Sequence, residues 1–129
     1  MEDSMKRQGA FSWNELMTTD PAAAVKFYSD LLGWTTKKYP MEGMEYTVVK
    51  AGDKEIGGIM GTPPGAEGVP PHWGAYITVD DVDATAKKAE ELGARIIVPP
   101  MDIPKVGRFC TFSDPQGAVI SIITYVPME

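Results

Sequence analysis

The chain contains one histidine, His72, which is the residue best suited to bind a metal ion. It opens the segment HWGAYITV, which has the composition of a strand. An ion needs several correctly placed ligands, and Glu15 and Glu55 are the carboxylates that could join His72. We therefore expect His72 to cap or pack the end of the preceding segment, with metal binding as the alternative.

Cys110 and Arg108 lie two residues apart in the segment GRFCTF. A cysteine becomes a nucleophile when a base stands beside it, and the spacing does not fix how far His72 lies from Cys110. A lone cysteine in an apolar strand more often fills the core, which is what we expect here. Arg108 could hold an anionic group of a substrate, although an arginine at the start of a strand is more often a surface charge.

Glu15 is the carboxylate with the most distinctive surroundings. In FSWNELMT, a strand would place Trp13, Glu15 and Met17 on one face and the intervening residues on the other. A carboxylate beside an indole on an enclosed face would have a pKa raised by desolvation, and it could then act as a general base. The alternative is that the edge of the sheet leaves Glu15 in contact with water.

These residues must be positioned by elements that occur twice, because the chain matches itself at an offset of 60 residues. Nine pairs are identical: Trp13 and Trp73, Thr18 and Thr78, Asp20 and Asp80, Ala24 and Ala84, Leu32 and Leu92, Gly33 and Gly93, Pro40 and Pro100, Met41 and Met101, Gly57 and Gly117.

One helix is predicted in each half. In TTDPAAAVKFYSDLLG, Asp20 is placed to cap the helix, Pro21 to begin it and Gly33 to end it. DDVDATAKKAEELGA repeats this plan in the second half. An apolar stripe along each helix should lie on a sheet, formed by Val25, Tyr28, Leu31 and Leu32 in the first helix and Val82, Ala86, Ala89 and Leu92 in the second.

Strands are predicted before and after each helix. FSWNELMT and WGAYITV precede the helices; WTTKKYP, MEYTVVK and KEIGGIM follow the first, and ARIIVPP, GRFCTF and AVISIITYV follow the second. Turns are expected at 52–53 and 114–117. The sequence therefore predicts one α+β domain over 1–129, made of two βαβββ modules, 10–61 and 72–126, joined by a proline- and glycine-rich linker, 62–71.

Two such modules, with FYSDLLGW closing the first helix and SDPQGA before the last strand, resemble the vicinal oxygen chelate superfamily. This superfamily includes glyoxalase I, bleomycin-resistance proteins, fosfomycin-resistance enzymes and extradiol dioxygenases. The resemblance covers residues 10–126 and implies a curved mixed sheet that forms a cup, with the Trp13 face toward the cup. It also implies a homodimer, because members of the family commonly pair.

The resemblance further implies four metal ligands on the inner strands, which this sequence does not supply. The position in the first strand falls at Trp13, and the one that opens the second half falls at Gly74 or Trp73. The position in the last strand of the second half falls at Ser121. The corresponding carboxylate of the first half should lie within 56–61, and this segment contains no carboxylate. We therefore expect no metal and no other cofactor.

Composition narrows the class of partner. The net charge of −6 and the lack of clustered Lys and Arg argue against a nucleic-acid partner. No signal sequence and no run of about 18 apolar residues is present, and the single cysteine fits a reducing compartment, so we expect a cytoplasmic protein that does not enter a membrane.

The predicted function is the binding of a small, partly apolar molecule in the cup without a metal, in the manner of the drug-sequestering members of the superfamily. The candidate ligand-binding residues are Trp13, Glu15, Met17, Tyr46, His72, Arg108, Cys110 and Ser121. Trp13, Met17, Tyr46, Trp73 and Tyr125 could equally form the dimer interface. The alternatives are a glyoxalase-like lyase or isomerase, either metal-free with Glu15 as base or with an unusual metal site, and a non-catalytic scaffold or regulatory domain.

Overall fold

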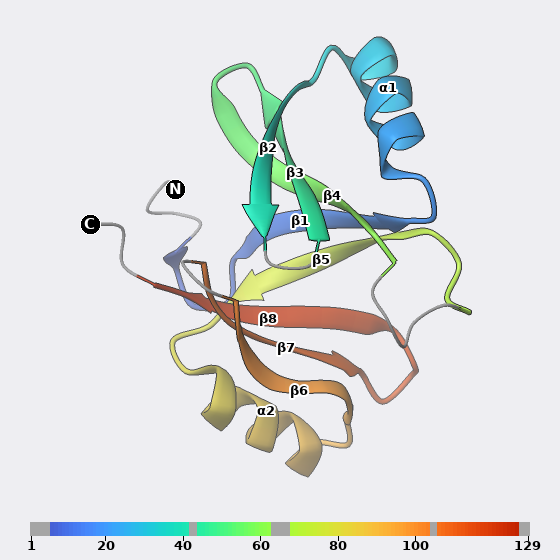
Figure 1. Cartoon of the computed structure of the whole chain (residues 1–129). Coiled ribbons are helices and arrows are strands. Elements are labelled where there is room, and N and C mark those ends of the chain that lie inside the picture. Colours follow the sequence, from blue (N-terminus) through green and yellow to red (C-terminus); the bar gives the residue numbers. More distant parts are fainter. Residues whose placement is uncertain (1–5, 42–43, 63–67, 104–105, 127–129) are drawn as a thin grey trace. The chain divides into compact units, whose positions relative to one another are not determined.

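The computed structural model describes residues 6–41, 44–62, 68–103 and 106–126, and within them the order β-α-β-β-β occurs twice (Figure 1). The first module contains β1 (Phe11–Thr18), α1 (Pro21–Leu32), β2 (Thr35–Met41), β3 (Met44–Ala51) and β4 (Lys54–Gly61). The second contains β5 (His72–Thr78), α2 (Val82–Glu91), β6 (Arg95–Ile103), β7 (Gly107–Ser113) and β8 (Val119–Tyr125). The predicted α+β class and both βαβββ modules are confirmed.

The chain divides into two compact units whose borders fall inside β1 and β5. One unit is Trp13–Gly74, and the other joins Met1–Ser12 to Ala75–Glu129. The amide of Gly9 donates to the carbonyl of Thr78, and the amide of Thr78 donates to that of Ala10, both over 2.8 Å. These bonds explain why the start of β1 belongs with the second module. The middle of the predicted linker, 63–67, lies outside the described residues.

In the first unit the strands follow the order β2-β3-β4-β1, with β1 parallel to β4 and the other neighbours antiparallel. One face of this sheet carries Leu16, Val49 and Ile59, which are buried beneath α1. Ala24, Val25 and Tyr28 of α1 pack against them. This packing fixes which side chains of β1 point toward the helix and which point away from it.

In the second unit the order is β5-β8-β7-β6, with β5 parallel to β8 and the other neighbours antiparallel. Helix α2 covers one face (Figure 1) and packs against a buried cluster that contains Val79, Val82, Ala86, Cys110 and Ile122. The two units therefore repeat one plan, a four-stranded mixed sheet with a helix against one face.

The helix starts correct the predicted repeat by one residue. Asp20 caps α1 by accepting a hydrogen bond from the amide of Ala23 over 3.1 Å, whereas α2 is capped by Asp81, which accepts from Ala84 over 3.0 Å. Asp80, the predicted partner of Asp20, is not the cap. The caps lie 61 residues apart, and α2, with 10 residues, is shorter than α1, with 12.

The predicted inward stripes were wrong at their carboxyl ends. Leu31, Leu32 and Leu92 are 62%, 51% and 70% exposed. Only the earlier turns of each helix pack on the sheet, so the last apolar residues extend past it. The predicted glycine stops are confirmed, since Gly33 and Gly93 both have positive φ.

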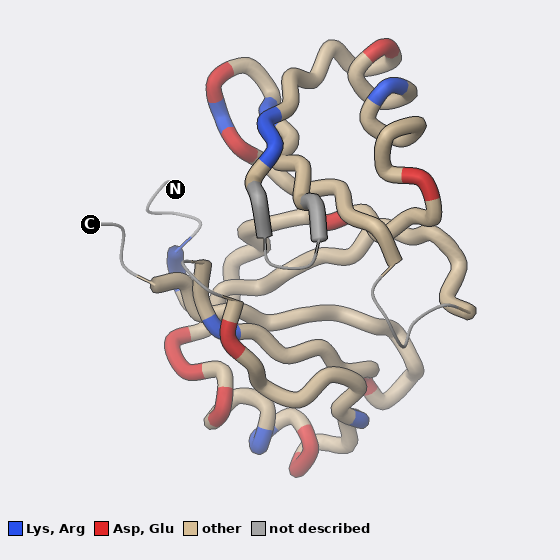
Figure 2. The backbone as a smooth tube through the Cα atoms, in the orientation of Figure 1, with Lys and Arg blue, Asp and Glu red and all other residues tan. Residues whose placement is uncertain are grey.

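Both helices and the hairpin of β3 and β4 carry charged residues of both signs, and β2 carries the adjacent lysines Lys37 and Lys38 (Figure 2). No helix in the described part of the chain is long and apolar enough to cross a membrane.

Candidate functional site

Three of the predicted site residues meet on the first module, in a cluster that we call the Tyr46 network (Trp13, Glu15 and Tyr46). The indole Nε1–H of Trp13 donates to the hydroxyl of Tyr46 over 2.9 Å. The same hydroxyl donates to Oε2 of Glu15 over 2.7 Å. All three side chains are half-buried. The network therefore holds a carboxylate in a fixed orientation beside an indole ring.

The strand register explains how residues 31 positions apart come together. Glu15 of β1 lies opposite Gly58 of β4, and Gly58 lies opposite Val48 of β3, so the side chain of Tyr46 reaches Glu15 across β4. A Cβ atom on Gly58 would overlap the hydroxyl and ring of Tyr46. Gly58 therefore leaves the space that the network needs. This role of Gly58 was not predicted from the sequence, although a glycine inside a strand often marks such a close approach.

The network lies on the face of the sheet opposite α1. Leu16 packs beneath α1, and side chains alternate along a strand, so its neighbours Glu15 and Met17 point to the other face together with Trp13. Met17 is half-buried and lies opposite Met60 in the register of β1 and β4. This face thus combines one carboxylate, one phenol and an apolar surface.

The direction of the two hydrogen bonds determines the chemistry. An indole N–H can only donate, so the hydroxyl of Tyr46 accepts from Trp13 and gives its own proton to Glu15. A hydroxyl that donates to a carboxylate stabilises the ionised form. Such a group can accept hydrogen bonds from the hydroxyl or amino groups of a ligand, while the indole offers a flat apolar contact.

The positions that correspond to the superfamily's metal ligands do not form a suitable donor set. Trp73 contacts the rings of Tyr28 and Trp34, and since side chains alternate along β5, Gly74 takes the position on the other face. Trp13 offers an indole and Ser121 a hydroxyl that is hydrogen-bonded to Thr111 over 2.6 Å. Within the described ranges, no three His, Cys, Asp or Glu side chains are grouped to hold an ion. These residues do not fit the family's metal.

His72 is exposed at the start of β5. Its ring nitrogen Nδ1 lies 2.9 Å from the carbonyl oxygen of Pro70, to which a protonated Nδ1 donates. The side chain is thereby tied to the end of the segment that precedes the strand.

Cys110 is fully buried, at 0% exposure, among the apolar side chains beneath α2. Burial raises the pKa of its thiol, with Glu90 and Asp83 adding to the effect. Because the thiolate is the reactive form, this environment disfavours a nucleophilic role. The placement agrees with a residue that fills the core.

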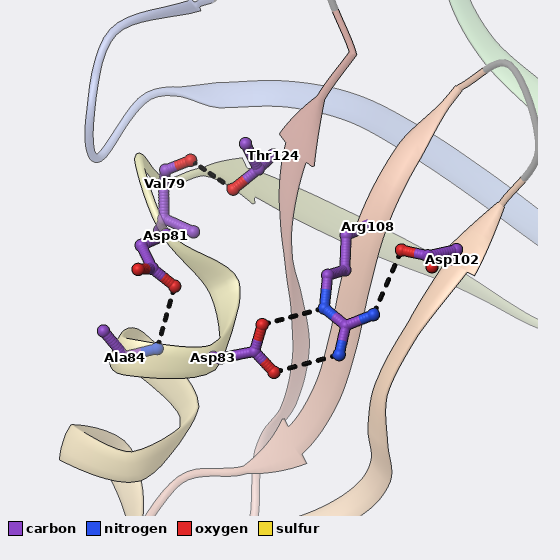
Figure 3. A network of polar contacts seen from close by, with 7 residues as sticks. All are labelled: Val79, Asp81, Asp83, Ala84, Asp102, Arg108 and Thr124. Atoms are coloured by element: carbon purple, nitrogen blue, oxygen red, sulfur yellow. Dashed lines mark hydrogen bonds and ion pairs between the residues drawn. The ribbon is translucent and has the colours of Figure 1, made fainter.

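Arg108 links three elements of the second unit (Figure 3). Its Nε and Nη2 atoms donate to Asp83 of α2 over 2.8 and 3.0 Å, and Nη1 donates to Asp102 of β6 over 3.0 Å. The hydrogen bond from Arg108 lowers the pKa of Asp83, and the same bond raises the pKa of Arg108. An anionic ligand would have to displace these carboxylates, so the pairing favours the surface-charge interpretation.

A family model described as Glyoxalase/Bleomycin resistance protein/Dioxygenase superfamily matches residues 10–122. The chain belongs to this family. The match agrees with the resemblance that the two modules and their helix and turn motifs indicated.

Two curated relatives are similar over most of this chain. The glyoxylase CFP32 of Mycobacterium bovis, whose name is provisional, is 47% identical over 122 residues, covering 94% of this chain and 46% of the relative. The anthracycline biosynthesis protein DnrV of Streptomyces peucetius is 34% identical over 127 residues, covering 88% of this chain and 46% of the relative. The chain thus spans about half the length of the curated relatives it matches.

Solved structures share the fold at low sequence identity. The hypothetical protein BH1468 of Bacillus halodurans has a TM-score of 0.73 at 12% identity, covering 95% of this chain and 99% of its own. Methylmalonyl-CoA epimerase of Mycobacterium tuberculosis has a TM-score of 0.67 at 16% identity, covering 98% of this chain and 93% of its own. Identities this low support the fold and not a shared activity.

Proposed function

We propose that this protein binds a small, partly apolar molecule on the face of the first module that carries the Tyr46 network, and that it does so without a metal ion. The observation that carries the proposal is the pair of hydrogen bonds that joins Trp13, Tyr46 and Glu15. A preorganised polar group beside an apolar surface is typical of small-molecule sites. The name of one curated relative, which refers to anthracycline biosynthesis, also supports a small-molecule role.

The network defines the chemistry of the ligand. A hydroxyl or amino group would donate to the carboxylate of Glu15, and a flat apolar part would pack on Trp13 and Met17. The donor set at the family's metal positions gives a reason to expect binding without an ion, since indole and glycine offer no ligand atom.

Binding can be tested on protein purified gently, analysed for metal content and then screened against small molecules by thermal shift and calorimetry. Tyr46→Phe removes both hydrogen bonds of the network, and Glu15→Gln removes the charge. We expect each to weaken a ligand at least about tenfold, equivalent to about 1.4 kcal/mol. Glu55→Gln is a matched control, because Glu55 pairs with Tyr39 on the surface of the same module over 3.2 Å.

Three results would contradict the proposal. A stoichiometric ion that survives purification, or one bound on titration with nickel, zinc, manganese or iron, would show that the site is not metal-free. A screen in which no small molecule binds would contradict the proposed binding function. Equal losses in Glu55→Gln and Glu15→Gln would show that the network is not the site.

A second candidate is a metal-free lyase or isomerase in which Glu15 is the general base. The hydrogen bond from Tyr46 favours this candidate, because it orients the carboxylate. Binding is the first proposal because it requires only the fixed donor and acceptor groups of the network. Loss of turnover with retained binding in Glu15→Gln would favour the enzyme.

We also propose that the protein acts as a cytoplasmic homodimer. Phe27, Leu31 and Leu32 are exposed apolar residues on α1, and association of two copies would cover such a surface. Light scattering after gel filtration would test the dimer. Co-purification of other proteins, with no small-molecule binding, would instead favour a scaffold.

A further inference from the structure

A hollow on the α1 face of the first module is separate from the Tyr46 network. It is partly open to solvent, has a volume of about 250 Å³ and is lined by Asn14, Trp34, Val49, Ile56, Gly57 and Trp73, a set that we call the tryptophan pocket. Asn14 alternates along β1 with Trp13 and Glu15, so the pocket and the network lie on opposite faces of one sheet.

Aromatic rings form the walls of the tryptophan pocket. The ring centroids of Trp34 and Trp73 are 6.0 Å apart, the two ring planes meet at 78°, and both rings contact Tyr28 of α1. The indole N–H of Trp73 donates to the hydroxyl of Tyr28 over 3.2 Å, which fixes the orientation of that wall. A ligand that enters would therefore meet surfaces that are already in place.

The hollow follows from the sequence of β4 and from how α1 packs. Gly57 has no side chain to fill the space, and a Cβ atom there would overlap the carbonyl of Asn14. Val49 and Ile56 supply an apolar floor. Trp34, which follows α1, also packs against this apolar floor. A hollow with an apolar floor and aromatic walls is typical of small-molecule sites, which makes this one a candidate.

We propose that the tryptophan pocket binds a neutral, planar aromatic molecule of two fused rings. An apolar cavity of about 150 Å³ is large enough to hold benzene, so about 250 Å³ suits a bicyclic molecule. Two indole walls near a right angle offer one stacked and one edge contact to a flat ring. Asn14 supplies the one polar side chain of the lining and would hydrogen-bond a single polar group on the ligand.

The three tryptophans provide a test that distinguishes the two faces. We would titrate 15N-labelled protein with indole and with benzofuran and follow the indole N–H signals, assigned by single Trp→Phe variants. We expect the signals of Trp34 and Trp73 to shift with one saturation curve, while that of Trp13 stays in place. No shift at millimolar probe, or a shift confined to Trp13, would overturn the proposal.

Two substitutions test the lining. Ile56→Phe fills the pocket and should weaken indole at least about tenfold. Leu31→Phe, which adds the same ring at an exposed residue of α1 outside the lining, is the control and should leave binding unchanged. A folded Ile56→Phe protein that binds indole as tightly as the parent would refute the pocket.

If the Ile56→Phe protein fails to fold, the Asn14→Ala variant tests the pocket instead. It should weaken indole about fivefold, the effect of one hydrogen bond, and leave benzofuran, which has no N–H, nearly unchanged. Equal affinities of parent and Asn14→Ala for indole would contradict the proposed anchor.

Discussion

The Tyr46 network depends on Gly58, and Gly58→Ala should break it. The added methyl group would overlap the hydroxyl and ring of Tyr46, so the phenol must swing away and lose its hydrogen bonds to Trp13 and Glu15. Two half-buried hydrogen bonds contribute about 1 kcal/mol each, and forced repacking adds about 1–2 kcal/mol. Alanine has less conformational entropy than glycine in the unfolded chain, and this offsets the loss of stability by about 0.5–1 kcal/mol.

The net loss should be about 2–3 kcal/mol in the free energy of unfolding. For a domain of this length that corresponds to a fall of roughly 9 °C in Tm. Urea unfolding followed by circular dichroism measures the free energy directly, and differential scanning calorimetry measures Tm. Gly61→Ala in the same strand is the matched control, because its Cβ would lie 3.7 Å from Pro21, an ordinary contact. It should be nearly neutral.

A double-mutant cycle locates the cause of the loss. In a Tyr46→Ala background the three atoms nearest to the new methyl group are gone, so Gly58→Ala should cost less than about 1 kcal/mol. Gly57→Ala should show no such rescue, since its Cβ would overlap the backbone carbonyl of Asn14. If Gly58→Ala costs the same with and without the Tyr46 ring, the reasoning is refuted.

Three further predictions concern the second unit. Arg108→Met should lower stability at neutral pH, and this effect should fade as pH falls below about 4, because a lowered Asp83 pKa stabilises the fold only while that carboxyl is ionised. Urea unfolding of the variant and the parent at pH 7 and pH 3 measures this, and an equal difference in midpoint at the two pH values would contradict it. Asp81→Ala should cost about 1 kcal/mol in urea unfolding and Asp80→Ala much less, and the reverse order would contradict the observed cap. The buried thiol of Cys110 should react with a disulfide reagent only on unfolding, so prompt labelling of the native protein would contradict its burial.

Elements and their ends could be predicted because their causes are local. The Asp20 cap and the two glycine stops each involve neighbouring residues, and the structure confirms them. The apolar periods located both helices but placed Leu31, Leu32 and Leu92 inward, and these residues are exposed. The offset of the repeat could not be read from identities alone. Two consecutive aspartates, Asp80 and Asp81, both suit a cap, and the structure shows that the second one is used.

The site was predicted in part for the same reason. Strand alternation placed Trp13 and Glu15 on one face, but their link to Tyr46 depends on the register of three strands, which no local pattern specifies. Arg108 could be placed at the start of a strand, whereas its two acidic partners come from other elements. Pairings between residues far apart in the sequence can be identified only once the fold is known.

The adjacent glycines of β4 connect these observations. Neighbouring residues of a strand face opposite sides of the sheet, so Gly58 makes room for Tyr46 on one face while Gly57 lines the tryptophan pocket on the other. Two candidate sites are thus back to back on one strand, separated only by the thickness of the sheet. Because each depends on a different glycine and a different tryptophan, substitutions can disable one site while the other reports that the module remains folded.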